Sequence, residues 1–215
     1  GGPGTGKSVV AINLLAECIH SGYMAQYITS NAAPRNVYST MLQKGFKKTE
    51  IKALFQSSGT FHARKKNELQ IAIVDEAHRL RKKSGMFQSQ GEDQVKEIIN
   101  ASIFSVFFID RNQRVTFNDA GTIDKIRNFA QEQNSLIYEG VLESQFRCNG
   151  SDGYLAWLDN VLQIAETANY DGFEGDYDFK IFENPHDMYE AIKAKNEINN
   201  KSRVLAGYCW DWPKE

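Results

Sequence analysis

The chain has 215 residues, of which 41% are hydrophobic, and this content is enough to bury the core of one domain and part of another. Its Lys+Arg count of 25 against an Asp+Glu count of 27 gives a net charge of −2, which excludes an overall basic excess of the kind that announces a nucleic-acid partner. Cys18, Cys148 and Cys209 lie far apart, which argues against a cysteine metal site or a disulfide framework. No apolar run approaches membrane-spanning length, and we expect a cytoplasmic protein.

The chain opens with eight residues that match the phosphate-binding pattern G-x-x-x-x-G-K-[ST] from end to end. Glycines let such a loop turn its N–H groups toward a polyphosphate, and the helix that follows contributes its positive amino-terminal end. We predict that Lys7 reaches the β- and γ-phosphates of ATP and that the Ser8 hydroxyl is a ligand of Mg²⁺. The residues expected to bind the nucleotide are Gly2, Pro3, Gly4, Thr5, Gly6, Lys7, Ser8 and Val9.

Helical and strand patterns alternate after this loop. Apolar spacing predicts a helix over residues 7–20, a strand over 25–29, helices over 33–43 and 49–56 with Thr49 as the cap, and a strand over 69–74 that is covered on both faces. Residues 79–91 are polar and basic, and we expect them to form a mobile surface loop. The pattern continues with a helix over 93–101, a buried strand over 103–109, a helix over 122–133 and a strand over 136–142. This alternation predicts an α/β fold, with a parallel sheet and helices on both of its faces.

The pattern changes beyond Arg147. A helix over 151–164 precedes an acidic, glycine-containing stretch over 169–178, and a strand over 179–182, a helix over 185–197 and a strand over 203–209 are then expected. We interpret the last three as the start of a second domain that is too short to be complete. A phosphate-binding loop normally follows a buried strand, so we also expect that this chain is a fragment of a longer protein, cut just after its first strand.

Two adjacent carboxylates, Asp75 and Glu76, follow the apolar strand predicted over 69–74. Ligands of open α/β sheets bind at the edge where the strands end, so this pair is expected to face the phosphate-binding loop. We predict that Asp75 holds Mg²⁺ through its water shell and that Glu76 orients and deprotonates the attacking water. His78 has two interpretations, which are coupling of this site to the neighbouring strand and satisfaction of a local hydrogen bond.

Two further segments place polar residues after predicted strands, Asp110-Arg111-Asn112-Gln113 and Gln145-Phe146-Arg147. Together with the motifs above, their order resembles that of the superfamily 1 helicases. In those helicases a D-x-x-Q motif at this strand end senses the γ-phosphate and touches nucleic acid, and Asp110 and Gln113 match its spacing. A Q-Y-R motif supplies an arginine that reaches the γ-phosphate, which points to Arg147. Residues 27–33 resemble the helicase segment that contacts the backbone of single-stranded nucleic acid.

The likeness is greatest to an uncharacterised bacterial helicase-like family, related to the helicase part of Schlafen-type proteins, through the stretches S-N-A-A-P-R-N-V-Y and D-E-A-H-R-L. This resemblance implies two RecA-like lobes with the nucleotide between them, and a strand order of 5-1-4-3-2. In this order the strand before Asp110 lies between the missing first strand and the strand before Asp75. The domains implied are a RecA-like ATPase core over 1–150, a linker helix and acidic loop over 151–176, and the truncated start of a second lobe over 177–215.

Residues and resemblance together predict ATP binding and Mg²⁺-dependent ATP hydrolysis by the motor core of a superfamily 1-like DNA/RNA helicase or translocase, with single-stranded nucleic acid as a partner. The catalytic residues expected are Lys7, Glu76, Gln113 and Arg147. One alternative is an AAA+-like switch ATPase, although the sequence after Arg147 does not read as the small helical lid of that class. The other is a nucleotide-binding regulatory module without turnover. Glu76 argues against it, because binding alone needs no water-activating carboxylate.

Overall fold

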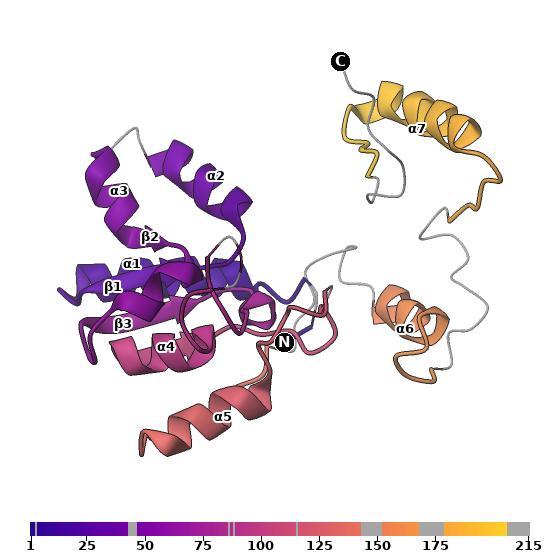
Figure 1. Ribbon diagram of the computed structural model, residues 1–215. Coiled ribbons are helices and arrows are strands. Elements are labelled where there is room, and N and C mark those ends of the chain that lie inside the picture. Colours follow the sequence, from indigo (N-terminus) through magenta and orange to yellow (C-terminus); the bar gives the residue numbers. More distant parts are fainter. Residues whose placement is uncertain are drawn as a thin grey trace. The chain divides into compact units, whose positions relative to one another are not determined.

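The structure is a computed structural model that describes residues 1–2, 4–42, 47–85, 87, 89–114, 116–142, 152–167 and 179–205. The chain divides into two compact units, Gly1–Tyr170 and Asp171–Glu215. The first unit contains a sheet with helices packed against it, and it carries the predicted site residues that are described below (Figure 1).

The sheet of the first unit has four strands in the order β2-β1-β3-β4. Their bounds are β1 Ala25–Ile28, β2 Phe55–Gln56, β3 Leu69–Val74 and β4 Ser102–Phe107. Every neighbouring pair is parallel, and the register places Ile28 beside Val74 and Val74 beside Phe107. The ends of β1, β3 and β4 are therefore level, so the segments that follow these three strands meet at one edge of the sheet.

Two helices of the first unit begin at side chains that cap them. Asp93 accepts a hydrogen bond from the Val95 N–H at the start of α4, and Thr122 accepts one from the Lys125 N–H at the start of α5. The helix bounds are α1 Lys7–His20, α2 Ala32–Leu42, α3 Lys48–Leu54, α4 Gln94–Ala101, α5 Ile123–Glu132 and α6 Asp152–Val161, with short 3-10 turns η1 Ser58–Ala63 and η2 Ala77–Arg79.

Two hydrophobic clusters cover the two faces of the sheet, and β3 contributes alternate residues to each. Ala72 and Val74 belong to the cluster with α4 and α5, whereas Ile73 belongs to the cluster with α1 and α3. Figure 1 shows α4 and α5 on one side of the strands and α2 and α3 on the other. Because successive side chains of a strand point to opposite faces, Asp75 continues the face of Ile73, toward α1.

The predicted α/β class with an all-parallel sheet is confirmed, and the fold is compatible with a RecA-like core. The observed neighbours β1, β3 and β4 reproduce the 2-3-4 part of the implied strand order. One predicted helix is shorter than expected, because α3 ends at Leu54 and the next two residues form β2 beside β1. Its cap is Lys47 rather than Thr49.

Two strand predictions on the β4 side of the sheet are wrong. Residues 136–142 form no strand, and the side chains of Leu136, Tyr138 and Val141 are exposed. In the implied order this strand pairs with strand 1, and the described part of the chain has no strand beyond β4 for it to join. Because no described strand pairs with its outer side, β4 is an edge strand of the described sheet, and its Ile103 and Phe104 are exposed. The prediction of a buried strand over 103–109 is therefore also wrong.

The segment predicted as a mobile surface loop over 79–91 is anchored at two points. Leu80 and Ser84 are buried, and Ser84 exchanges two backbone hydrogen bonds with Gln90, at 2.7 and 3.0 Å. The Gln94 side chain donates a further hydrogen bond to the Ser84 hydroxyl. Basic composition indicated exposure correctly for Arg81 and Lys82, but it gave no sign of these anchors.

The second unit contains one helix among its described residues, α7 Pro185–Asn199. Asn184 caps it by accepting a hydrogen bond from the Asp187 N–H at 2.9 Å. The expected strand over 179–182 is not formed, and residues 203–205 are not a strand either, while residues 206–209 lie outside the described part of the chain. Within the described ranges, no helix has the length and apolar character needed to cross a bilayer.

Gly121 lies in the segment that connects β4 to α5, at the point where this segment packs against η2. Its N–H and that of Ala120 both donate to the Leu80 carbonyl, at 3.2 and 2.6 Å. A Cβ at position 121 would stand 1.8 Å from the Ala77 carbonyl oxygen. We expect Gly121→Ala to lower the free energy of unfolding by about 3 kcal/mol, because backbone on both sides must move.

The measurement is the urea midpoint, and Gly140→Ala is the matched control. A Cβ at Gly140 meets nothing within 4 Å, so that variant should stay within about 0.5 kcal/mol of the parent. Equal midpoints for the two variants would show that the close contact at Gly121 does not constrain the fold.

Candidate functional site

The glycine-rich loop has the backbone shape of an anion cradle. Gly4 and Gly6 have φ of 78° and 80°, a left-handed conformation that glycine adopts without strain. Gly6 is the N-cap of α1, and no side chain caps the helix there, so the amides of its first turn are not used by a capping group. The Thr5 hydroxyl turns inward and donates to the Gly2 carbonyl at 2.9 Å. Pro3 lies outside the described residues.

Lys7 connects this loop to the end of β4. Its Nζ donates to the Gly1 and Gly2 carbonyls at 3.0 and 2.6 Å and lies 3.3 Å from Asp110 Oδ2. The Lys7 side chain is 7% exposed and that of Asp110 is 3% exposed, so this is a buried ion pair. Sequence patterns singled out both residues, but nothing in them indicated that the two would meet.

Asp75 receives hydrogen bonds from two hydroxyl groups on the same oxygen. The Ser8 hydroxyl donates to Asp75 Oδ2 at 2.6 Å, and the Tyr27 hydroxyl donates to it at 2.5 Å. The Glu76 N–H donates to the other oxygen, Oδ1, at 3.0 Å. Burial, and then the hydrogen bond to Asp75, raise the pKa of Tyr27 well above its usual range, so the phenol keeps its proton and remains a donor.

Ser8 and Asp75 together fit a magnesium site. A hydroxyl and a carboxylate are hard oxygen donors, which Mg²⁺ prefers, and they stand at the start of a helix beside the anion cradle. Within the ranges that the structure describes, no three His, Cys, Asp or Glu side chains converge as metal ligands. A cation here would therefore complete its shell with water and phosphate oxygens, as Mg²⁺ commonly does.

The Glu76 side chain contacts His78. Its φ is 54°, a left-handed conformation at the end of β3, and its Oε2 lies 3.0 Å from His78 Nε2. On the other side of the ring, His78 Nδ1 accepts a hydrogen bond from the Asp110 N–H at 3.4 Å. His78 thus makes a local contact with Glu76 and also contacts the backbone that follows the neighbouring strand β4.

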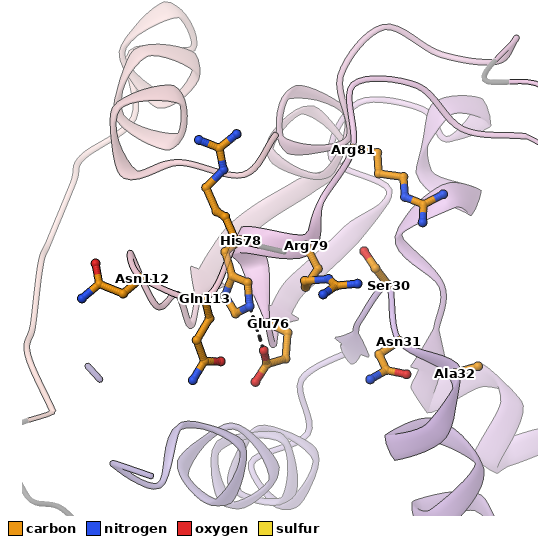
Figure 2. Close-up of a pocket in the computed structure, with 10 residues that line it drawn as sticks. Ser30, Asn31, Ala32, Glu76, His78, Arg79, Arg81, Asn112 and Gln113 are labelled. Atoms are coloured by element: carbon orange, nitrogen blue, oxygen red, sulfur yellow. Dashed lines mark ion pairs between the residues drawn. The ribbon is translucent and has the colours of Figure 1, made fainter. Parts of the chain in front are cut away.

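A cavity of about 490 Å³ lies at the same edge of the sheet, among the segments that follow β1, β3 and β4 (Figure 2). Glu76 is its one acidic lining residue, against three arginines. Figure 2 shows the Glu76 and His78 side chains in contact, as the dashed line marks, between Gln113 and Arg79. The lining residues are Ser30, Asn31, Ala32, Glu76, His78, Arg79, Arg81, Asn112, Gln113 and Arg114. This cavity, which we call the arginine pocket, combines positive charge with amide and hydroxyl groups.

Asp119 orders two of these arginines. It is 1% exposed, and its carboxylate accepts hydrogen bonds from the Thr116 N–H and hydroxyl, both at 3.0 Å. Its Oδ2 lies 3.6 Å from Arg79 Nε, and its backbone carbonyl accepts two hydrogen bonds from the Arg114 guanidinium at 3.1 and 2.8 Å. Sequence reasoning missed Asp119.

The predicted site residues thus fall into two groups. Ser8 meets Asp75, and Lys7 meets Asp110, beside the glycine-rich loop. Glu76 and Gln113 instead line the arginine pocket. Val9 belongs to neither group, since its side chain is exposed on the first turn of α1, and the predictions for Pro3 and Arg147 fall outside the described residues.

Comparison with known proteins supplies the family. The model of the family "Schlafen group 3, DNA/RNA helicase domain" matches residues 1–215, and the chain therefore belongs to this helicase-domain family. The uncharacterized protein YPL245W of Saccharomyces cerevisiae is 24% identical over 249 residues, an alignment that covers 99% of this chain and 54% of the yeast protein. The chain thus spans about half the length of that relative. No solved structure matches the chain.

The family match supports the predicted relation to Schlafen-type helicase domains and suggests a nucleotide-dependent, helicase-like function. It does not extend to the bacterial origin implied by the resemblance, and the curated relative reported above comes from yeast.

Proposed function

We propose that this chain binds ATP and hydrolyses it with Mg²⁺, as the motor core of a superfamily 1-like DNA/RNA helicase or translocase. The observation that carries this proposal is the 2.6 Å hydrogen bond between Ser8 and Asp75, residues 67 positions apart in the chain. It brings the start of the helix behind the glycine-rich loop against the carboxylate at the end of β3. Membership of a helicase-domain family supports the same conclusion.

The residues of the loop have distinct roles in this proposal. The residues from Gly2 to Val9 bind the triphosphate, all except Pro3 through backbone N–H groups, and Lys7 exchanges its present oxygen partners for the β- and γ-phosphates. Ser8 and Asp75 hold Mg²⁺, which supplies charge neutralisation on the phosphate oxygens. The proposed water-activating group is Glu76, which deprotonates the attacking water.

Gln113 and Arg147 complete the proposed ATPase. Gln113 senses the state of the γ-phosphate from the end of β4, where it also lines the arginine pocket. Arg147 supplies a fixed positive charge to the transferred phosphoryl group. Their positions in the sequence order of motifs support these two roles.

The arginine pocket supports single-stranded nucleic acid as the partner. Arg79, Arg81 and Arg114 surround it, and guanidinium groups bind phosphate oxygens in planar, paired geometry. Amide side chains such as Asn31 offer hydrogen bonds to sugars and bases. This local charge also explains how a chain with a net charge of −2 could bind a polyanion.

Replacement of Arg81 by alanine tests whether the arginine pocket binds single-stranded nucleic acid, and it should leave the fold intact. Arg81 is exposed, and its side chain makes no hydrogen bond or ion pair within the described residues. We expect the variant to weaken binding of a single-stranded oligonucleotide by roughly fivefold, similarly for all base sequences, and to reduce the salt dependence by about one phosphate contact. Fluorescence anisotropy at several salt concentrations measures both effects.

Arg127→Ala is the matched control, because Arg127 is on α5, pairs with Glu139 and does not line the pocket. An equal loss of affinity in the two variants would indicate general charge attraction, and the proposal that the arginine pocket binds nucleic acid would then be wrong.

The proposed activity is tested by ATP turnover of the full-length protein, with and without single-stranded DNA or RNA. Hydrolysis that nucleic acid stimulates is the expected result. Absence of hydrolysis under both conditions rejects the proposal, and hydrolysis without stimulation rejects its motor part. An AAA+-like switch ATPase and a binder without turnover are less well supported, because the family match is to a helicase domain.

A further inference from the structure

Tyr27 is a buried residue of β1 whose hydroxyl reaches the candidate metal site. It is fully buried and lies beside Ile73 of β3 in the sheet register, on the face of the sheet that packs against α1. Asp75 is two residues beyond Ile73 and projects to the same face. The Tyr27 hydroxyl consequently meets Asp75 Oδ2 at 2.5 Å, on the oxygen that also accepts the Ser8 hydrogen bond.

The Tyr27 ring is held by two other aromatic rings. Tyr38 of α2 contacts it edge-on, with ring centroids 5.8 Å apart, and Phe55 of β2 lies 5.5 Å from it. Phe55 is also the register partner of Tyr27 in the sheet, so backbone pairing and ring packing fix the same contact. Because the ring cannot turn without disrupting this cluster, the position of its hydroxyl is determined by the core.

We propose that Tyr27 is a positioning residue for the metal-holding carboxylate Asp75, an inference that rests on the proposed Mg²⁺-dependent ATPase. A carboxylate on a flexible side chain binds a cation best when other donors fix its orientation, and loss of such donors commonly costs metal affinity. Tyr27 and Ser8 hold Oδ2 from two directions, while the Glu76 N–H holds Oδ1. The Ser8 oxygen keeps lone pairs for a cation while its own proton is donated in the hydrogen bond to Asp75.

Tyr27→Phe removes the donor and keeps the ring, and Tyr38→Phe is the matched control. Tyr38 belongs to the same aromatic cluster, and no hydrogen bond of its hydroxyl is found within the described residues. The readout is binding of a fluorescent ATP analogue to the full-length protein as Mg²⁺ is varied. We expect Tyr27→Phe to raise the half-saturating Mg²⁺ concentration about tenfold, and Tyr38→Phe to leave it unchanged.

The possible results separate this inference from the proposed function. If the unaltered protein shows no Mg²⁺-dependent binding of the analogue, the proposed ATPase and this inference both fail. If it does, but Tyr27→Phe has the same half-saturating Mg²⁺ concentration and only a lower melting temperature, Tyr27 is a purely structural core residue and only the inference fails.

A second measurement avoids dependence on the folding of Tyr27→Phe. The ¹⁹F resonance of 3-fluorotyrosine at position 27 reports on the hydrogen bond to Asp75. It should shift when ATP is added with Mg²⁺ and stay in place when ATP is added with a chelator. A resonance that is identical under the two conditions overturns the inference.

Discussion

Replacement of Glu76 by glutamine is expected to leave ATP binding intact and to lower turnover by about 10²- to 10⁴-fold, the range typical for loss of a general base. Glutamine has nearly the same shape and can still accept a hydrogen bond from His78 Nε2, so the 3.0 Å contact can be kept without a large steric change. Binding should persist because the phosphate-binding groups lie on the glycine-rich loop, whereas Glu76 lines the arginine pocket.

Fluorescent-nucleotide titration and steady-state phosphate release measure the two quantities separately. Glu68→Gln is a matched control, since Glu68 immediately precedes β3 and Glu76 follows its other end. The control should change neither quantity. Equal loss of binding and turnover in Glu76→Gln would show that Glu76 has a structural role, and the assignment of water activation would then be wrong.

Lys7→Ala should weaken ATP binding severely and lower turnover by about 10²- to 10³-fold, because the variant loses the one cation that the loop offers to the β- and γ-phosphates. The substitution also leaves Asp110 buried without its ion-pair partner. Removal of one member of a buried pair typically costs about 3–5 kcal/mol of stability, so loss of binding could follow from unfolding alone.

The double variant Lys7→Ala/Asp110→Asn separates these two causes. Asparagine is neutral, so the buried unpaired charge disappears and the melting temperature should recover toward that of the unaltered protein. ATP binding should not recover, because Lys7 is still missing. Recovery of both properties would show that Lys7 serves the fold and does not contact phosphate.

The arrangement of Glu76 adds a condition to the proposed mechanism. Its carboxylate pairs with His78 in the arginine pocket, while Asp75 projects toward α1 and Ser8. The backbone of Glu76 has left the strand conformation, with a φ of 54°, and its carboxylate contacts His78 rather than Ser8. Water activation therefore requires the Glu76 side chain to exchange His78 for the attacking water.

Local sequence patterns were sufficient for most of the helices and strands. The helix over 7–20 and the strand over 69–74 have the predicted bounds, because an amphipathic stripe and a short apolar run each carry their own periodicity. The prediction of a strand over 136–142 was wrong because a strand needs a neighbouring strand to pair with, and no local pattern reports whether that neighbour is present.

By itself, the sequence determined the parallel α/β class, the glycine-rich loop ahead of a helix, and the acidic pair after β3, since each depends on residues close together in the chain. Only the tertiary structure decided that Lys7 meets Asp110, that Tyr27 meets Asp75, and that Glu76 joins the arginine pocket. These contacts depend on strand register and on which face each residue takes, and both are set by the packing of the sheet against α1 and α4.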